Sequence, residues 1–165
     1  MAGLAIRDEA ALVQAALEHY AQRGSFRSFS STPRTASTIE FTFSWFRDVT
    51  FRLVFDRRRR TLTFVDMLPG IPPRSAMDRG LRAFVQRYTS TAVPEHRRVD
   101  PRRVVVSVVN RAGAESLIFA FRTKDVAYAV RKAVHLAHDI LQDFLNDGRY
   151  VQYSVDYFNL NPEMA

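Results

Sequence analysis

The sequence predicts an α+β protein: an antiparallel sheet of about five strands with three helices, in the order α-β-β-β-α-β-β-α, plus a possible C-terminal strand. Two observations predict this class. Runs of alternating apolar and polar residues, typical of half-buried strands, follow one another through short turns, which favours antiparallel pairing. Segments with apolar residues at the three- and four-residue spacing of a helix stand before, between and after these runs.

The N-terminal part predicts a helix followed by a loop. Residues 8–23 place apolar side chains on one stripe, with Asp8 suited to cap the start of the helix and Gly24 to end it. Residues 24–38 are rich in serine, threonine and arginine, which indicates a loop with room for a short edge strand at 26–29.

Three strands are predicted next. Residues 39–45 and 49–55 both alternate apolar with polar side chains, and only residues 46–48 separate them, so the two runs predict a hairpin. Residues 56–60 then form a turn into a third strand at 61–66.

A second helix is predicted from Ser75 to about Ser90. Glycine and proline residues at 69–73 end the preceding strand, and Ser75 with Asp78 three residues later resembles a capping box. A polar loop at 91–102 follows the helix.

The C-terminal part predicts two strands, a helix and a tail. The strands are expected at 103–110 and 116–122, and the helix at 123–147, ending at Gly148. The tail, 148–165, alternates apolar and polar residues from Tyr150 onward and therefore predicts one more strand. With no repeat and no low-complexity linker, residues 1–165 are expected to form a single domain.

Composition excludes several kinds of chemistry. The chain of 165 residues contains no cysteine, which excludes disulfides, thiolate zinc sites, iron–sulfur clusters and cysteine nucleophiles. The first residues lack the apolar core of a signal peptide, and no apolar run approaches the ~20 residues that span a bilayer. We therefore expect a cytoplasmic protein that does not engage membranes.

Arginine supplies almost all of the positive charge. The net charge is +7, and 22 of the 24 basic residues are arginine. Guanidinium groups suit carboxylate and phosphate partners, so the clustered arginines are candidate contacts for a bound partner. These candidates are Arg57, Arg58, Arg59, Arg60, Arg97, Arg98, Arg102 and Arg103. Nucleic acid is the alternative partner, although the phenylalanines occupy core positions of strands and not stacking positions.

The last predicted helix carries two polar constellations. His135 and His138, with Asp139, face one way and resemble half of a metal site, but the further ligands are lacking, so we expect a solvent-exposed helix face and no metal. Asp139, Asp143 and Asp147 stand near the C-terminal end of the helix, where the helix dipole disfavours negative charge. We expect an arginine cluster to compensate them.

The strands at 103–110 and 116–122 are apolar at most positions on both faces. A sheet with one face in water alternates, so both faces of these strands are expected to be covered, one of them by the tail, a second subunit or a bound partner. We expect a homodimer. The candidate self-association residues are Val105, Val109, Ile118, Ala120, Tyr153 and Tyr157.

The order of elements over residues 8–147 resembles that of the secretion-chaperone-like fold, which type III secretion chaperones share with the YbjN family. The resemblance implies a protein that dimerises and binds protein segments without catalysing a reaction. Two features depart from the pattern, since secretion chaperones are usually acidic and the tail lies outside it. No diagnostic motif accompanies the resemblance, so it assigns no residue a role.

Searches of the sequence for phosphate loops, nucleophile elbows, zinc-protease motifs and calcium loops find none. The sequence therefore predicts a non-enzymatic, dimeric protein-binding or chaperone-like module without cofactor or metal. Two alternatives remain open: a nucleic-acid-binding protein that uses its arginine clusters, and a small enzyme whose site has no recognisable motif.

Overall fold

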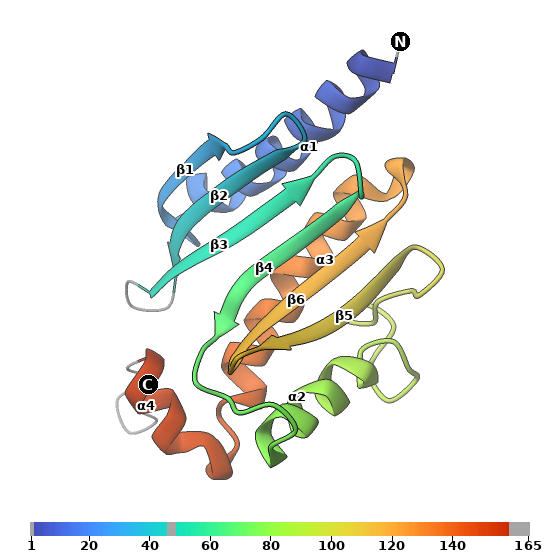
Figure 1. Cartoon of the computed structure of the whole chain (residues 1–165). Coiled ribbons are helices and arrows are strands. Elements are labelled where there is room, and N and C mark those ends of the chain that lie inside the picture. The colour runs from blue at the N-terminus through green and yellow to red at the C-terminus, as the bar shows by residue number, and fades with distance from the viewer. Residues whose placement is uncertain (1, 46–48, 159–165) are drawn as a thin grey trace.

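The computed structural model describes residues 2–45 and 49–158 and shows the α+β class (Figure 1). The described residues form an open antiparallel sheet of six strands and four α-helices. The strands are β1 (Arg27–Pro33), β2 (Thr38–Trp45), β3 (Val49–Asp56), β4 (Thr61–Leu68), β5 (Val104–Arg111) and β6 (Ala114–Phe121). The helices are α1 (Ala2–Gln22), α2 (Ala76–Arg87), α3 (Val126–Asp139) and α4 (Val151–Phe158). Short helical turns are Thr123–Asp125, Ile140–Phe144 and Gly148–Tyr150.

The strands lie in the order β1-β2-β3-β4-β6-β5, and every neighbouring pair is antiparallel. The predicted hairpin is confirmed, because β2 and β3 pair along their whole length down to Trp45 opposite Val49. The turn residues 46–48 lie outside the described residues. Strand β6 inserts between β4 and β5, so β5 is an edge strand.

Strand β1 lies within the segment 24–38, where the sequence predicted a loop with at most a short strand at 26–29. The strand is longer than predicted and pairs with β2 at the edge of the sheet. All but one of its side chains are exposed, so no apolar alternation marks it in the sequence. The register shifts between Arg27 and Ser30, and Ser28 adopts a positive φ of 54°, which together form an edge irregularity.

One face of the sheet forms the core with α1 and α3, which lie behind the strands in Figure 1. The inward side chains of the strands are mostly phenylalanine and leucine, and burying each stabilises the fold by about 1.5–3 kcal/mol. On the helices, Leu17 of α1 and Ala133 and Ala137 of α3 are fully buried against this layer. The predicted apolar stripe of the last helix is therefore confirmed.

Helix α2 begins where the sequence predicted. The Ser75 side chain caps the helix by accepting a hydrogen bond from the Asp78 backbone N–H at 3.2 Å. The Asp78 carboxylate in turn accepts from the Arg74 N–H at 3.0 Å, one residue earlier than in the usual capping box.

The predicted C-terminal strand is wrong, because residues 151–158 form helix α4. Phe158 is buried and stacks on Phe51 of β3 with a centroid distance of 6.3 Å, while the Tyr153 hydroxyl donates to the Pro69 carbonyl at 2.6 Å. These contacts hold α4 on the helical side of the sheet. Residues 159–165, the end of the predicted tail, lie outside the described residues.

The described helices cover only one face of β5 and β6, so of the three covers that the sequence allowed for the second face, helix α4 of the tail does not supply it; a second subunit or a bound partner stays a prediction. Figure 1 looks onto the face that no described helix covers, which we call the open face. Val105 on this face is 56% exposed, and helix α4 packs against Phe51 on the opposite side of the sheet. Ser107 and Ser116 interrupt the apolar residues here, so the open face is more polar than the valine-rich sequence suggested.

Within residues 2–45 and 49–158, no helix combines the length and the apolar character needed to cross a bilayer.

Replacing Phe158 by alanine tests the helical packing of the tail. Because Phe158 is 2% exposed, F158A is expected to lower the free energy of unfolding by about 3 kcal/mol, measured by urea denaturation. Gln152→Ala, on the exposed side of the same helix, is the control and should change stability by less than about 0.5 kcal/mol. Equal, small effects of both substitutions would contradict a docked α4.

Candidate functional site

The segment after α2 and the outer side of α3 enclose a cavity of about 900 Å³, which we call the basic hollow. Of the predicted arginines, Arg98, Arg102 and Arg103 line it. Arg131 and Lys132 of α3 complete the cationic wall, and the sequence reasoning had not selected either of them. The site thus combines two segments about thirty residues apart, with no spacing pattern that links them.

Only part of this positive charge is compensated. Arg102 pairs with Asp100 at 3.2 Å, and Arg103 pairs with the buried carboxylate of Asp125 at 2.8 Å. Arg98 donates to the Val93 carbonyl, which carries no net charge, at 3.2 Å. Among the described residues, no carboxylate forms an ion pair with Arg98, Arg131 or Lys132; these are the uncompensated cations of the basic hollow.

Lys132 is unusual for a lysine because it is only 5% exposed. Its ammonium group donates a hydrogen bond to the His96 carbonyl at 3.1 Å. Burial lowers the pKa of Lys132 below its usual range, and the nearby charges of Arg131 and Arg103 lower it further. The protonated lysine is therefore held in an unfavourable environment.

An aromatic ring forms part of the wall of the basic hollow. The guanidinium of Arg103 lies 3.8 Å from the centroid of the Tyr128 ring, within cation–π range. The Tyr128 oxygen accepts a hydrogen bond from the Asp100 N–H at 2.9 Å, which ties the loop 91–102 to α3.

A second cavity of about 550 Å³, the aromatic hollow, lies beside the basic hollow. Its lining includes Tyr20 of α1, Phe26 next to β1 and Trp45 of β2, which are packed together as a cluster of rings. Both cavities include His96 and His135 in their walls, so one opens beside the other along α3. Together they form a groove with an apolar half and a cationic half.

His135, at the boundary of the two hollows, is held in its neutral form. Burial lowers the pKa of His135 below its ordinary value of 6.5, and the charges of Lys132 and Arg131 lower it further. The imidazole therefore supplies one donor and one acceptor to the groove at neutral pH.

Arg97 lines the aromatic hollow, and its charge is compensated by carboxylates. It bridges Asp139 at 2.9 Å and Asp143 at 3.0 Å, and the Tyr88 hydroxyl also donates to Asp139. This network raises the pKa of Tyr88 through burial and through the hydrogen bond to Asp139. The expectation that arginine compensates the carboxylates at the end of the last helix is confirmed for Asp139 and Asp143, and Asp147 pairs with Arg149 at 3.0 Å.

The four arginines of the β3–β4 turn line neither hollow. The backbone N–H groups of Arg58 and Arg59 donate to the Asp56 carboxylate at 3.0 and 3.1 Å, and the Arg57 side chain donates to the Ala36 carbonyl. Arg60 lies 3.7 Å from the buried Glu9 carboxylate. These contacts shape the turn, so the structure separates it from the cationic wall on α3.

The histidine pair on α3 contributes to the aromatic hollow and not to a ligand cluster. His138 lies 3.4 Å from Asp139. Within the described part of the chain, no group of three histidine, aspartate or glutamate side chains is arranged to hold a metal ion.

Four of the six predicted self-association residues lie together on the open face. Val105 pairs with Ala120 across β5 and β6, and Val109 and Ile118 lie on the same side of these strands. Tyr153 and Tyr157 lie elsewhere, stacked on each other in α4 with a centroid distance of 4.7 Å. The two groups therefore belong to different surfaces.

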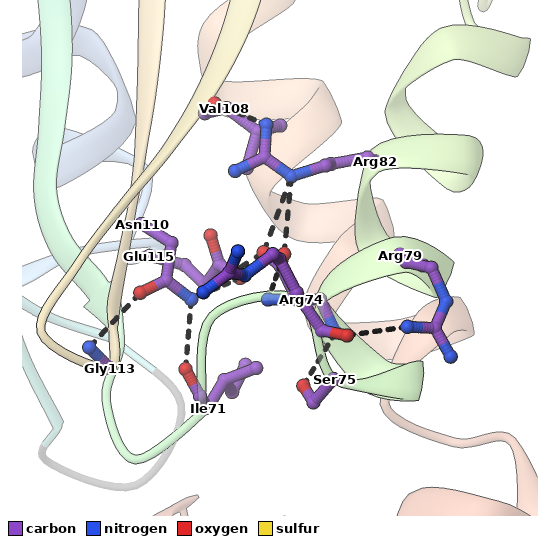
Figure 2. A network of polar contacts seen from close by, with 10 residues as sticks. Ile71, Arg74, Ser75, Arg79, Arg82, Val108, Asn110, Gly113 and Glu115 are labelled. Atoms are coloured by element: carbon purple, nitrogen blue, oxygen red, sulfur yellow. Dashed lines mark hydrogen bonds and ion pairs between the residues drawn. The ribbon is translucent and has the colours of Figure 1, made fainter.

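A buried pair of carboxyl groups joins α2 to the β5–β6 hairpin (Figure 2). Glu115 is 1% exposed and accepts from the Asn110 amide at 3.0 Å, while Arg82 pairs with Asp78 at 3.3 Å. Asn110 also donates to the Ile71 carbonyl at 2.8 Å. Figure 2 shows how these contacts draw the helix, the loop and the hairpin together.

The pKa shifts of the two carboxyl groups fit a proton shared between them. Burial and the hydrogen bond with Asp78 raise the pKa of Glu115 to about 7, and the same hydrogen bond lowers the pKa of Asp78 to about 2. A protonated Glu115 donating to Asp78 accounts for both shifts. Sequence reasoning missed this pair, although a glutamate at an inward position of β6, in register with Leu117 and Phe119, was the available signal.

Burial assigns this pair a structural role. Glu115 and Asp78 are 1% and 3% exposed, so a substrate cannot reach them without an opening of α2. The groove along α3 is accessible and is the stronger candidate for a functional site.

No protein-family model, curated protein or solved structure matches the chain. The resemblance to secretion chaperones therefore stays a prediction, and the groove must be interpreted from its own chemistry.

The shared proton predicts a pH-dependent stability. Because the pKa of Glu115 rises from 4.5 in the unfolded chain to about 7 in the fold, its contribution is complete below pH 4.5 and is lost as the pH rises through 7. Glu115→Gln keeps a donor toward Asp78 and removes this titration. Between pH 5 and pH 8, the wild type should lose about 1–3 kcal/mol of unfolding free energy relative to E115Q in urea titrations.

Glu95→Gln, an exposed substitution, is the control for this measurement and should retain the wild-type slope. Parallel pH profiles for the wild type and E115Q would contradict the shared proton.

Proposed function

We propose that the protein is a non-enzymatic module that binds a segment of another protein in the groove along α3. One observation carries the proposal: the aromatic and basic hollows share His96 and His135, so an apolar cavity opens directly beside a cationic one. Both volumes, about 550 and 900 Å³, fall in the range of about 300–1,000 Å³ typical of ligand sites.

The chemistry of the groove defines the segment. An aromatic or leucine side chain fits the aromatic hollow, where it contacts Tyr20, Phe26 and Trp45. Acidic residues next to it face Arg131 and its cationic neighbours in the basic hollow. The preferred partner is therefore an acidic segment with one apolar anchor.

Two hydroxyl groups that line the basic hollow support a binding role over a catalytic one. Thr89 and Ser90 donate to the carbonyls of Gln86 and Arg87 at 2.8 and 2.7 Å, so neither is activated by a neighbouring histidine. The lack of cysteine agrees with a cytoplasmic protein, where we place it.

The proposal includes a homodimer through the open face. Val105 is the most exposed of the large apolar side chains of the described sheet, and it lies on the edge strand β5 beside Ala120 and near Ile118. A two-fold axis brings the same residues of two copies together, so this patch is its own partner. The dimer leaves the groove free, because the groove lies on the helical side.

Single-stranded nucleic acid is the second candidate, since cations next to aromatic rings also suit phosphates and stacked bases. The groove supports this alternative less well, because the predicted turn arginines 57–60 do not extend its cationic half. A protein segment bound through an apolar anchor should bind with weak salt dependence, whereas nucleic-acid binding should fall steeply with salt.

Selection of peptides on the protein tests the proposed function. From a phage-displayed library of random twelve-residue peptides, selection should enrich sequences with an aromatic or leucine residue close to aspartate or glutamate. Trp45→Ala and Arg131→Glu should each weaken the selected peptides about tenfold or more by calorimetry, because each removes a wall of the groove.

Arg58→Glu changes the charge equally but lies outside the groove, so it is the matched control and should change the affinity less than about twofold. Peptides that bind all three variants like the wild type would contradict the proposed site.

Sedimentation of purified protein tests the dimer. At micromolar concentration, the wild type should sediment as a dimer, and Val105→Asp combined with Ile118→Asp should yield a folded monomer, because the charges repel across the two-fold axis. Arg58→Asp, in the β3–β4 turn, introduces an aspartate outside the patch around Val105; it is the control and should remain dimeric. A monomeric wild type would contradict the dimer but not the groove.

A further inference from the structure

Hydrogen-bond donors without acceptors converge in the basic hollow. The ammonium of Lys132 carries three N–H donors, and among the described residues its hydrogen bond is to the His96 carbonyl. The Tyr128 oxygen accepts from the Asp100 N–H, which leaves its own proton available to donate. Arg131 is exposed above the Tyr128 ring, at 5.5 Å from its centroid. Three different groups thus offer donors to one cavity.

The charge in the cavity points to a doubly charged anion. Arg98, Arg131 and Lys132 have no carboxylate partner in the described chain, and the remaining unpaired acid of the wall is Glu95. The surplus of cations over acids is therefore greater than a single carboxylate would neutralise. A phosphate monoester carries about two negative charges and three strong acceptor oxygens, which matches the convergent donors.

The burial of Lys132 strengthens this interpretation. Lys132 is 5% exposed as a residue and lies near the charges of Arg131 and Arg103, so its protonated form is unfavourable unless an anion accompanies it. Arg102 and Arg103 are already paired with carboxylates, so the three uncompensated cations are the ones available to bind an anion.

We propose that the basic hollow is a phosphate-binding site, in which Lys132, Arg131 and the Tyr128 hydroxyl hold a phosphate group and Arg98 lies at its rim. The site goes beyond the proposed protein-segment function and does not depend on it. The cavity of about 900 Å³ is larger than a phosphate ion needs, so it has room for the organic part of a phosphate ester.

Calorimetric titration with inorganic phosphate, adenosine monophosphate and O-phosphoserine tests the site at constant ionic strength. At least one of the three should bind with a stoichiometry of one per chain, and sodium acetate at the same ionic strength should bind at least about tenfold more weakly. Tighter binding of an ester than of inorganic phosphate identifies an ester as the source of the phosphate group, and equal binding identifies the free ion.

Two variants localise the binding. Lys132→Met and Arg131→Gln should each weaken phosphate binding about tenfold or more, because each removes a charged donor. Arg58→Gln, outside the hollow, removes the same charge and should leave binding within about twofold of the wild type. Because Lys132 is buried, thermal unfolding checks that K132M folds; Arg131 is exposed, so R131Q tests the site even where K132M does not fold.

The imidazole of His135 reports occupancy in the wild type. It lines the hollow, and neighbouring cations hold its pKa below 6.5, so an anion bound there should raise the pKa of His135 in an NMR titration. The charged groups that act on His135 are Lys132, Arg131, Asp139 and His138, all on α3 itself, and His96 of the loop 91–102 lines both hollows with it. No binding of any of the three probes, an unchanged His135 pKa, or equal losses in R131Q and R58Q would overturn the proposal. A protein that binds phosphate but no peptide would contradict the proposed protein-segment function and not this phosphate site.

Discussion

Burial of one side of α3 against the sheet determines where everything else in the molecule lies. Ala129, Ala133 and Ala137 are fully buried, and their small side chains allow the helix axis to approach the phenylalanine-rich face of the sheet. Since the period of the helix fixes this inward stripe, Arg131 and His135 must face outward. The groove forms there, because α1, β2 and the segment after α2 rise on either side of the outer face.

Much of the fold followed from local patterns, and the failures have physical causes. The hairpin of β2 and β3 was predictable because inward phenylalanines alternate with polar residues on a half-buried surface. In the tail, Tyr150, Ser154 and Phe158 are also spaced by four residues, so the same stretch fits a strand or a helix. The contact of Phe158 with Phe51, which no local pattern contains, selects the helix. Strand β1 was underestimated for a different reason. An exposed edge strand needs no apolar residues, so its sequence carries no alternating pattern.

The site was less predictable than the fold. Arginine-rich stretches were visible, but the sequence does not tell which guanidinium groups are already compensated. Arg103 pairs with the buried carboxylate of Asp125 in the turn before α3, and Lys132 is buried where it bonds to the His96 carbonyl of the loop 91–102. Ion pairs and burial of this kind join distant segments, so only the tertiary structure separates a structural arginine from one that is free to bind.

Arg97 and Arg98 illustrate the point because they are neighbours with opposite electrostatic roles. The charge of Arg97 is neutralised by Asp139 and Asp143, whereas Arg98 bonds to a neutral carbonyl and faces the hollow. A net charge of +7 therefore says little about where an anion binds. What matters is the local difference between cations and acids that line one cavity, because the fields of neighbouring uncompensated charges add there. In this chain that difference is concentrated along the outer side of α3, next to an apolar cavity.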